Sequence, residues 1–259
     1  MEIDYAGLTD IGCRREENED TIASWPDGAG LVFAVADGMG GAEGGEFASR
    51  LAIDALGAAL ADAATQQRPA HRRLRSAVQA ANLAVHDECL SAPSRRGMRT
   101  TLTATAIVDG MLISAHVGDC RLYRLRGGRL TRLTRDHNRA ALLVRLGLLR
   151  PEAAHRHKAQ NRLTRSLGEG PMVRVDLVRE PTRSGDVLLQ CTDGLYRLVS
   201  EGEIVEVLSS SAPEVACRTL IQLAAAAGGD DNVSVQIASL APRAAPFRSD
   251  SVLSTMSCA

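Results

Sequence analysis

The stretch LVFAVADGMGGAEGG, residues 31–45, joins an apolar run to a glycine-rich turn. A strand that runs into such a turn and then into a helix often cradles a phosphate. Asp37, however, stands first in this turn and would repel an anionic ligand. A Walker A loop is excluded because Glu46 follows Gly45, and a dinucleotide fingerprint is excluded because Glu43 replaces its third glycine. The remaining interpretation is that Asp37 binds a cation and that the cation meets the phosphate.

Other carboxylates also stand where predicted strands end or turns begin. They are Glu19 and Asp20, Asp119, Asp193 and Asp231. A single Asp-Gly pair is an ordinary turn, but several such positions together are difficult to explain by turns alone. Oxygen ligands without a Cys or His cluster favour Mg²⁺ or Mn²⁺ over zinc.

The composition is that of a globular protein. The chain has 259 residues, of which 45% are hydrophobic, so it can bury a sizeable core. No apolar run reaches the ~18 residues of a membrane span. The stretch MEIDYAGLTD at the N-terminus does not have the pattern of a secretion signal. The six cysteines show no CxxC pair and no regular spacing, which favours reduced thiols over disulfides. We therefore expect a cytoplasmic protein with no membrane partner.

Basic residues are concentrated in one segment. Residues 121–165 carry thirteen basic and two acidic residues, a formal charge of +11, although the whole chain is at −1. Three interpretations remain open: a solvated face, a nucleic-acid site, and a site that attracts an anionic protein substrate. Seven aromatic residues are too few for the stacking platforms of nucleic-acid binding, so we expect no nucleic-acid partner.

The hydrophobic pattern predicts helices in pairs and strands in hairpins. Helices are predicted at 46–64, 72–90, 201–210 and 213–227. Strands are predicted at 31–36, 101–108, 111–117, 121–126, 128–133, 173–178, 186–191 and 232–240. The strands within 101–133 should form one antiparallel meander, because Asp-Gly and Gly-Gly turns separate them. This order predicts an α+β domain of antiparallel sheet covered by helix pairs, with 138–165 as a helix-rich excursion beside it.

Eight motifs follow one another in a characteristic order. They are NED (18–20) with Arg15, DGMGG (37–41), TTL (100–102), VGDCR (117–121), TRDH (134–137), LTRSLG (163–168), TDGL (192–195) and DDNVSV (230–235). Together they resemble the type 2C metal-dependent protein phosphatases in their bacterial serine/threonine form. The resemblance spans residues 4–240. It implies a four-layer α-β-β-α sandwich of two antiparallel sheets flanked by antiparallel helix pairs, with a catalytic domain over 1–240 and a basic flap at 138–165. The tail at 241–259 lacks periodicity, and we expect it to be disordered.

The resemblance also implies a two-metal centre in a cleft between the sheets. Asp37 would bridge both Mg²⁺ or Mn²⁺ ions, and Gly38 would offer its backbone carbonyl to one of them. Asp193 and Asp231 would complete the other metal site.

Further residues around this centre take their roles from the same resemblance. Glu19 and Asp20 would hold waters of the metals or assist as ligands, and Arg15 would grip the substrate phosphate. Asp119 would help to hold a third metal ion. Eukaryotic members commonly carry a histidine, a proposed general acid, where Met39 stands. The proton for the leaving group would then come from elsewhere, and we expect a water near Asp119 to supply it.

The implied activity is hydrolysis of phosphoserine and phosphothreonine by a hydroxide that bridges two metals, without a phosphoenzyme and without a cysteine nucleophile. Phosphorylated proteins, including a cognate serine/threonine kinase, would be the partners of a monomeric enzyme. The basic flap would attract them through Arg145, Arg150 and Arg156. Two alternatives remain: a non-catalytic binding protein on the same fold, and a metal-dependent hydrolase of a small phosphorylated metabolite.

Overall fold

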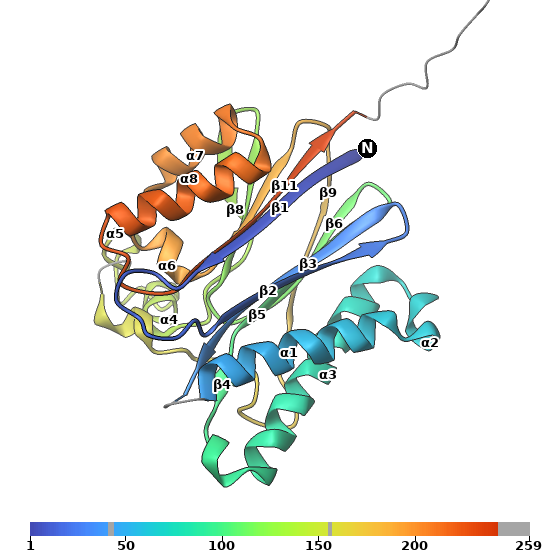
Figure 1. The fold of residues 1–259 in the computed structure, drawn as a ribbon, viewed down its shortest axis with the longest axis vertical. Helices are drawn as coiled ribbons and strands as arrows, with labels where there is room; N and C mark the ends of the chain where they lie inside the picture. Colours follow the sequence, from blue (N-terminus) through green and yellow to red (C-terminus); the bar gives the residue numbers. More distant parts are fainter. Residues whose placement is uncertain (41–43, 155–156, 243–259) are drawn as a thin grey trace, which may run out of the picture.

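Two antiparallel sheets pack face to face, and helices cover the outer face of each (Figure 1). The computed structural model describes residues 1–40, 44–154 and 157–242. Within these ranges the layers follow the order helix, sheet, sheet, helix. The predicted four-layer α+β sandwich is therefore confirmed.

The first sheet has the strand order β1-β11-β10-β7-β8. Its strands are β1 (Glu2–Asp10), β7 (Arg121–Arg126), β8 (Arg129–Arg132), β10 (Val187–Cys191) and β11 (Val233–Ala241). The second sheet has the order β2-β3-β5-β6-β9, with β4 paired to β3. Its strands are β2 (Asp20–Asp27), β3 (Gly30–Met39), β4 (Arg99–Thr100), β5 (Leu102–Val108), β6 (Met111–Val117) and β9 (Asp176–Pro181). All of these pairings are antiparallel.

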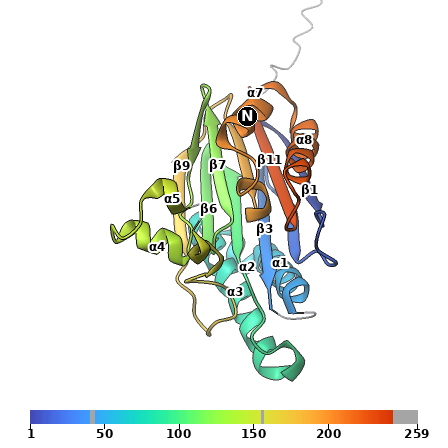
Figure 2. The ribbon, with the colours of Figure 1, turned by 90° about the vertical axis from the view of Figure 1, so that its left-hand side faces the viewer.

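The helices divide between the two outer faces and the predicted flap. The second sheet is covered by α1 (Gly44–Ala61) and α3 (Ala70–Ser91), which are connected through α2 (Ala63–Gln66) and followed by the 3₁₀ turn η1 (Pro93–Arg95). The first sheet is covered by α7 (Glu201–Ser210) and α8 (Pro213–Ala226), and α6 (Asp193–Tyr196) precedes them. The flap contains α4 (Arg139–Arg145), α5 (Pro151–Ala154) and the 3₁₀ turn η2 (Lys158–Asn161). Figure 2 shows α4 and α5 standing outside the four layers, at the edge of the sandwich.

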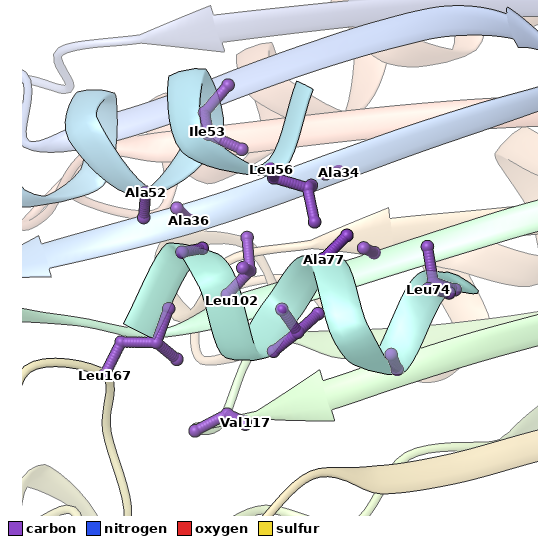
Figure 3. Packing of buried hydrophobic residues seen from close by; sticks show 14 of the residues in the cluster. Ala34, Ala36, Ala52, Ile53, Leu56, Leu74, Ala77, Leu102, Val117 and Leu167 are labelled. Atoms are coloured by element: carbon purple, nitrogen blue, oxygen red, sulfur yellow. The ribbon is translucent and has the colours of Figure 1, made fainter. Parts of the chain in front are cut away.

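Small side chains let α1 and α3 lie close to the second sheet. Figure 3 shows Ala52 of α1 beside Ala36 of β3, with Leu102 close to α3 and with Leu56 and Leu74 further along the two helices. All five residues are buried. Burying one leucine side chain contributes about 1.5–3 kcal/mol, so this layer is a main source of stability.

The central strands are apolar on both faces because a hydrophobic core covers each face. In β3, Val32, Ala34 and Ala36 belong to the helix-facing core, whereas Phe33 belongs to the core between the sheets. A strand that is buried on both faces reads as a continuous apolar run, as this one does.

The layer between the sheets changes from apolar to polar along β10. Leu188 lies in the apolar part of this layer. Two positions further, the buried Gln190 accepts a hydrogen bond from the Thr105 hydroxyl (2.7 Å) and donates to the side-chain oxygen of Gln236 (3.0 Å). Two positions beyond that stands Thr192, where the carboxylates of the candidate site begin.

The predicted single meander over 101–133 is wrong. β5 and β6 pair in the second sheet, whereas β7 and β8 pair in the first. The chain crosses between the sheets at residues 118–120, which have no strand structure. Both hairpins have the same apolar pattern, so periodicity alone could not assign them to different sheets.

Two further strand predictions need correction. The strand predicted at 173–178 begins only at Asp176, because Val173 and Val175 pack against the core under α3 instead of pairing. β1 and β2 were not predicted, because their side chains are mostly exposed or half-buried and their alternation is weak.

None of the helices in the described ranges is long and apolar enough to cross a membrane. Most of the tail predicted to be disordered, from residue 243 onward, lies outside the described residues.

Candidate metal and phosphate site

Strand alternation places Asp37 on the face of β3 that looks toward the other sheet. Phe33 and Asp37 are four residues apart and therefore share this face. Asp20 of β2 is the direct partner of Asp37 in the antiparallel register. Side chains in such a pair have Cβ atoms about 4.5–5.5 Å apart, and like charges there are destabilising. The pairing indicates a site built for cations.

Three more aspartates reach the same place. Asp193 is the first residue of α6, and Asp119 lies in the crossing between β6 and β7. Both are buried, at 8% and 4% exposure, and Asp231 stands two residues before β11. Electrostatic interactions link Asp37 with the other four carboxylates, Asp193, Asp20, Asp119 and Asp231. The structure thus brings all five predicted aspartates together.

Burial and mutual repulsion raise the pKa values in this aspartate cluster. Burial raises the pKa of Asp37 well above its usual range, and the charges of Asp193 and Asp20 raise it further. Burial also raises the pKa of Asp20 and that of Asp119 to about 7, and Asp193 adds to both shifts. Within the described ranges, no donor contacts the Asp37 carboxylate. A divalent cation would remove this repulsion, so the donor set fits one.

Two arginines supply positive charge at the aspartate cluster. The Arg15 guanidinium lies 2.7 Å from an oxygen of Asp231 and 3.5 Å from an oxygen of Glu19. Arg197 pairs with Asp193 at 2.5 Å. The Arg15 side chain is 44% exposed, whereas that of Arg197 is 23% exposed. Arg15 is therefore the arginine that an incoming solute meets first.

Gly38 is required by the close approach of three backbone segments. Its N–H donates to the Glu19 carbonyl at 3.0 Å. A Cβ at this position would collide with the carbonyl of Gly45 at the start of α1. Gly38 has no positive φ, so it is needed for space and not for a turn. Residues 41–43 of the glycine-rich turn lie outside the described residues.

Thr192 and Asn232 hold the segments that carry the clustered carboxylates, and we assigned them no role from the sequence. The Thr192 hydroxyl donates to Asp20 Oδ2 at 2.8 Å. The side-chain oxygen of Asn232 accepts the Glu19 N–H at 2.9 Å, while its amide nitrogen donates to the carbonyl of Glu17. Both residues lie inside recognised motifs and beside an aspartate, which is the only signal that could have identified them.

Asn138 and Tyr196 hold Asp119, and the sequence motifs gave neither residue a role. The Asn138 amide donates to Asp119 Oδ2 at 3.3 Å, and the Tyr196 hydroxyl donates to the Asp119 backbone carbonyl at 3.1 Å. The neighbouring Gly118 N–H donates to His137 Nδ1 at 3.0 Å, and the His137 N–H donates to the Gly118 carbonyl at 2.7 Å. These contacts tie the crossing between the sheets to the first residues of the flap.

The donor set suits hydrated magnesium or manganese better than a fully enclosed ion. Among the residues that the structure describes, no three His, Cys, Asp or Glu side chains form a ready-made metal cage. Mg²⁺ usually keeps several waters and takes only one or two carboxylates from the protein. An aspartate cluster with a backbone carbonyl beside it is consistent with that kind of binding.

Comparison with known proteins identifies a family that matches most of the chain, including most of the site residues. The family model described as "Protein phosphatase 2C" matches residues 14–231. The chain belongs to the protein phosphatase 2C family. This confirms the resemblance found in the sequence motifs.

Curated relatives of this phosphatase 2C chain come from several bacteria. The serine/threonine protein phosphatase PstP of Mycobacterium tuberculosis is 41% identical over 90% of this chain and 44% of its own length. The chain thus spans less than half of that relative. The protein phosphatase PhpP of Streptococcus pneumoniae is 35% identical over 90% of this chain and 96% of its own. Among solved structures, the catalytic domain of PstP in complex with two manganese ions has a TM-score of 0.81 at 36% identity, covering 93% of this chain and 99% of that one.

Proposed function

We propose that this protein is a metal-dependent phosphatase that hydrolyses phosphoserine and phosphothreonine in other proteins. The proposal rests on the aspartate cluster, in which five carboxylates share one largely buried site with two arginines. Carboxylates repel a dianionic phosphate monoester unless divalent cations lie between them. Family membership supports the proposal, and both curated relatives described above are named as protein phosphatases.

Four groups would hold the two catalytic cations. They are the carboxylate of Asp37, the carbonyl of Gly38, and the carboxylates of Asp193 and Asp231. When bound, two divalent cations polarise the phosphate ester and supply a hydroxide nucleophile at neutral pH, so no phosphoenzyme is required.

Three further carboxylates would assist. Glu19 and Asp20 would orient waters of the cations, and Thr192 fixes Asp20 for this role through its 2.8 Å hydrogen bond. Asp119 would help to hold a third cation, with Asn138 keeping its carboxylate in place.

Arg15 would bind the phosphate of the substrate. Its guanidinium is partly exposed at the aspartate cluster, and a planar fork of N–H donors matches two phosphate oxygens. Charge-assisted hydrogen bonds of this kind also stabilise the negative charge on the phosphoryl oxygens during transfer.

The buried cysteines do not suit a nucleophilic role. Burial raises the pKa of Cys120, next to Asp119, well above its usual range. It also raises the pKa of Cys191 and that of Cys217 to about 12. These thiols stay protonated at neutral pH, and the thiolate is the reactive form. This supports direct attack on phosphorus without a phosphocysteine.

The leaving serine or threonine alkoxide needs a proton, and Met39 cannot supply one. We propose that a water held at Asp119 does so. Asn138 and Tyr196 fix the position of this aspartate from two sides, which supports a defined site for such a water.

The remaining expectations concern context. The catalytic domain would span 1–240 with the flap at 138–165. The substrates would be phosphorylated proteins, including a cognate serine/threonine kinase, and the enzyme would act as a cytoplasmic monomer.

Phosphate release from a phosphothreonine peptide tests the proposal. We expect release with Mn²⁺, none with EDTA, and none from an Asp37→Asn variant that remains folded. Release from small phosphate esters but not from any phosphopeptide would favour a metabolite hydrolase. No metal-dependent release from either substrate would leave a non-catalytic binding protein.

A further inference from the structure

A cavity of about 700 Å³ lies between the flap and the body of the domain, beside the aspartate cluster. Its flap wall comes from α4 and α5, and its other wall includes residues of β7, β8 and α6. Six arginines line it, from both walls: Arg121, Arg132, Arg135, Arg145, Arg165 and Arg174. Among the described residues, three acidic side chains line it as well: Asp136, Asp176 and Glu201. The lining therefore carries an excess of positive charge.

Some of these arginines are already neutralised inside the protein. Arg121 donates to both oxygens of Asp136, at 3.1 and 2.8 Å. Arg165 donates to Asp176 at 2.7 Å. The Arg165 pair joins the flap to β9, and both pairs leave little charge for a ligand.

Arg135 and Arg145 are different. Neither makes an ion pair with any described residue, and both are exposed. One follows β8 and the other ends α4, so they come from different elements that line the cavity. Two unpaired guanidinium groups lining one cavity suit a carboxylate or a phosphate.

The cavity is adjacent to the aspartate cluster. Asn138 and Tyr196 line it, and each of them also contacts Asp119. A single peptide could therefore place one residue in the aspartate cluster and a neighbouring residue in the cavity. Ala140, Ala141 and Val144 of α4 give the same cavity an apolar wall, which suits the rest of a peptide side chain.

We propose that this cavity binds an acidic side chain of the substrate, near in sequence to the phosphorylated serine or threonine. The shared chemistry is an anionic group on a peptide, either the carboxylate of glutamate or aspartate or a second phosphate. This proposal rests on the proposed function and specifies its substrates as phosphoproteins that carry a further negative charge close to the phosphorylated residue.

Matched phosphothreonine peptides provide the test. One has neutral flanks, one has glutamates before the phosphothreonine, one has them after it, and one carries an additional phosphoserine. The value of kcat/KM is measured for each with Mn²⁺ at low ionic strength. The glutamate and phosphoserine peptides separate the two sources of negative charge.

The variant that removes the cavity charge is Arg135→Gln with Arg145→Gln. Its matched control is Arg129→Gln with Arg139→Gln. Arg129 lies on β8 and Arg139 on α4; both are exposed, and neither lines the cavity. The two variants therefore lose the same charge, each from one position on or just after β8 and one position on α4.

We expect the wild type to prefer at least one of the anionic peptides over the neutral one by about three- to tenfold, which corresponds to two partly exposed ion pairs. The preference should persist in the control variant, disappear in the cavity variant and weaken at high salt. Turnover of the neutral peptide should not change. Equal preference in all proteins, no preference in the wild type, or equal loss in both variants would overturn the proposal.

A binding measurement decides the question even if no phosphopeptide is turned over. Fluorescence anisotropy with a labelled peptide that carries the glutamates and no phosphate, in EDTA, reports the cavity without catalysis. The cavity variant should bind it about three- to tenfold more weakly than the control variant. Equal binding by both variants would reject the cavity, whereas absent turnover with unequal binding would reject only the proposed activity.

Discussion

Asp186 and Asp193 stand at opposite ends of the same strand, β10, and their surroundings are opposite too. The buried Asp186 carboxylate accepts two hydrogen bonds of 2.6 Å from the Arg126 guanidinium. Burial works to raise its pKa, but Arg126 prevails and the pKa is lowered. Burial also raises the pKa of Asp193, and there Arg197 offsets the effect only in part.

The difference shows how one residue type serves two purposes in one sheet. At the Asp186 end, the carboxylate is paired with the Arg126 guanidinium, so its charge contributes to stability. At the Asp193 end, negative charges are gathered against one another, and Asp37 faces Asp20 across a strand pair. The second arrangement costs stability and is understandable only as a site for a positively charged ligand.

The largest expected effect on activity comes from the Asp193 end of β10, where the carboxylates lie against one another. Asp37→Asn should lower kcat/KM for a phosphothreonine peptide by about 10³-fold or more, the scale on which a central electrostatic group acts. The same variant, in EDTA at pH 7.5, should unfold at equal or higher denaturant concentration than the wild type, because one repelled charge is gone. Urea unfolding checks this, and a clear loss of stability would contradict the interpretation that the cluster is strained.

At the Asp186 end, a substitution should lower stability and leave activity unchanged. Asp186→Asn leaves Arg126 without its carboxylate, and we expect the free energy of unfolding to fall by about 2–4 kcal/mol. Turnover per folded molecule should not change, since Asp186 lies at the other end of β10. Urea unfolding measures the stability and the peptide assay measures the turnover. Lost turnover in a folded variant would contradict the separation of the stabilising Asp186 end from the Asp193 end.

The pH dependence of stability should separate the two ends further. The pKa of Asp20 and that of Asp119 are raised to about 7 in the folded state, against about 3.9 in an unfolded chain. The folded protein therefore holds protons that the unfolded chain has released, and stability falls as pH rises through this window. Asp186 has the opposite sign: its stabilisation is complete above the unfolded pKa and is lost only as pH falls below it.

In EDTA, we expect Tm to drop by roughly 4–8 °C between pH 5 and pH 7.5, for a loss on the order of 2 kcal/mol. Mn²⁺ should stabilise more at pH 7.5 than at pH 5 and should flatten the profile. Thermal melts at the two pH values measure this, with Asp37→Asn as the variant of smaller slope. A Tm that rises with pH in EDTA would show that the cluster is not strained.

The smallest expected effect concerns the support of Asp119. Asn138 accepts a hydrogen bond from the Ala141 N–H and so caps α4, besides donating to Asp119. Asn138→Ser keeps a capping oxygen but loses the amide that donates to Asp119. We expect kcat to fall by about tenfold, with KM and Tm nearly unchanged. Steady-state kinetics with Asn138→Asp for comparison, which caps but adds a charge, tests this positioning role, and an unchanged kcat in the serine variant would remove it.

Much of this arrangement could be predicted from the sequence. Apolar runs that lead into an aspartate placed Asp37 and Asp193 at strand ends, and Asp231 stands where the last predicted strand begins. Strand ends of a sandwich meet at its edges. The motif order then supplied the fold and its four layers.

The remaining features of the site depend on tertiary contacts that hydrophobic periodicity does not reveal. The crossing at 118–120, which brings Asp119 to the site, has the same turn signals as a hairpin. The hydrogen bond from the Glu19 N–H to the Asn232 side chain joins residues more than two hundred positions apart. The basic segment was predicted to act through Arg145, Arg150 and Arg156, yet only Arg145 lines the cavity among the described residues, and Arg156 lies outside them.

The buried amides of Gln190 and Gln236 between the sheets would set the depth to which a cation could enter. Gln190 has both its oxygen and its nitrogen engaged, and the oxygen of Gln236 is taken by Gln190. An ion that moved inward past Asp37 would therefore meet oxygens that already accept hydrogen bonds, and then the side chains of Leu188 and Phe33. The saturated amides would form the floor of the aspartate cluster and would confine bound cations to the rim, where a phosphate could reach them.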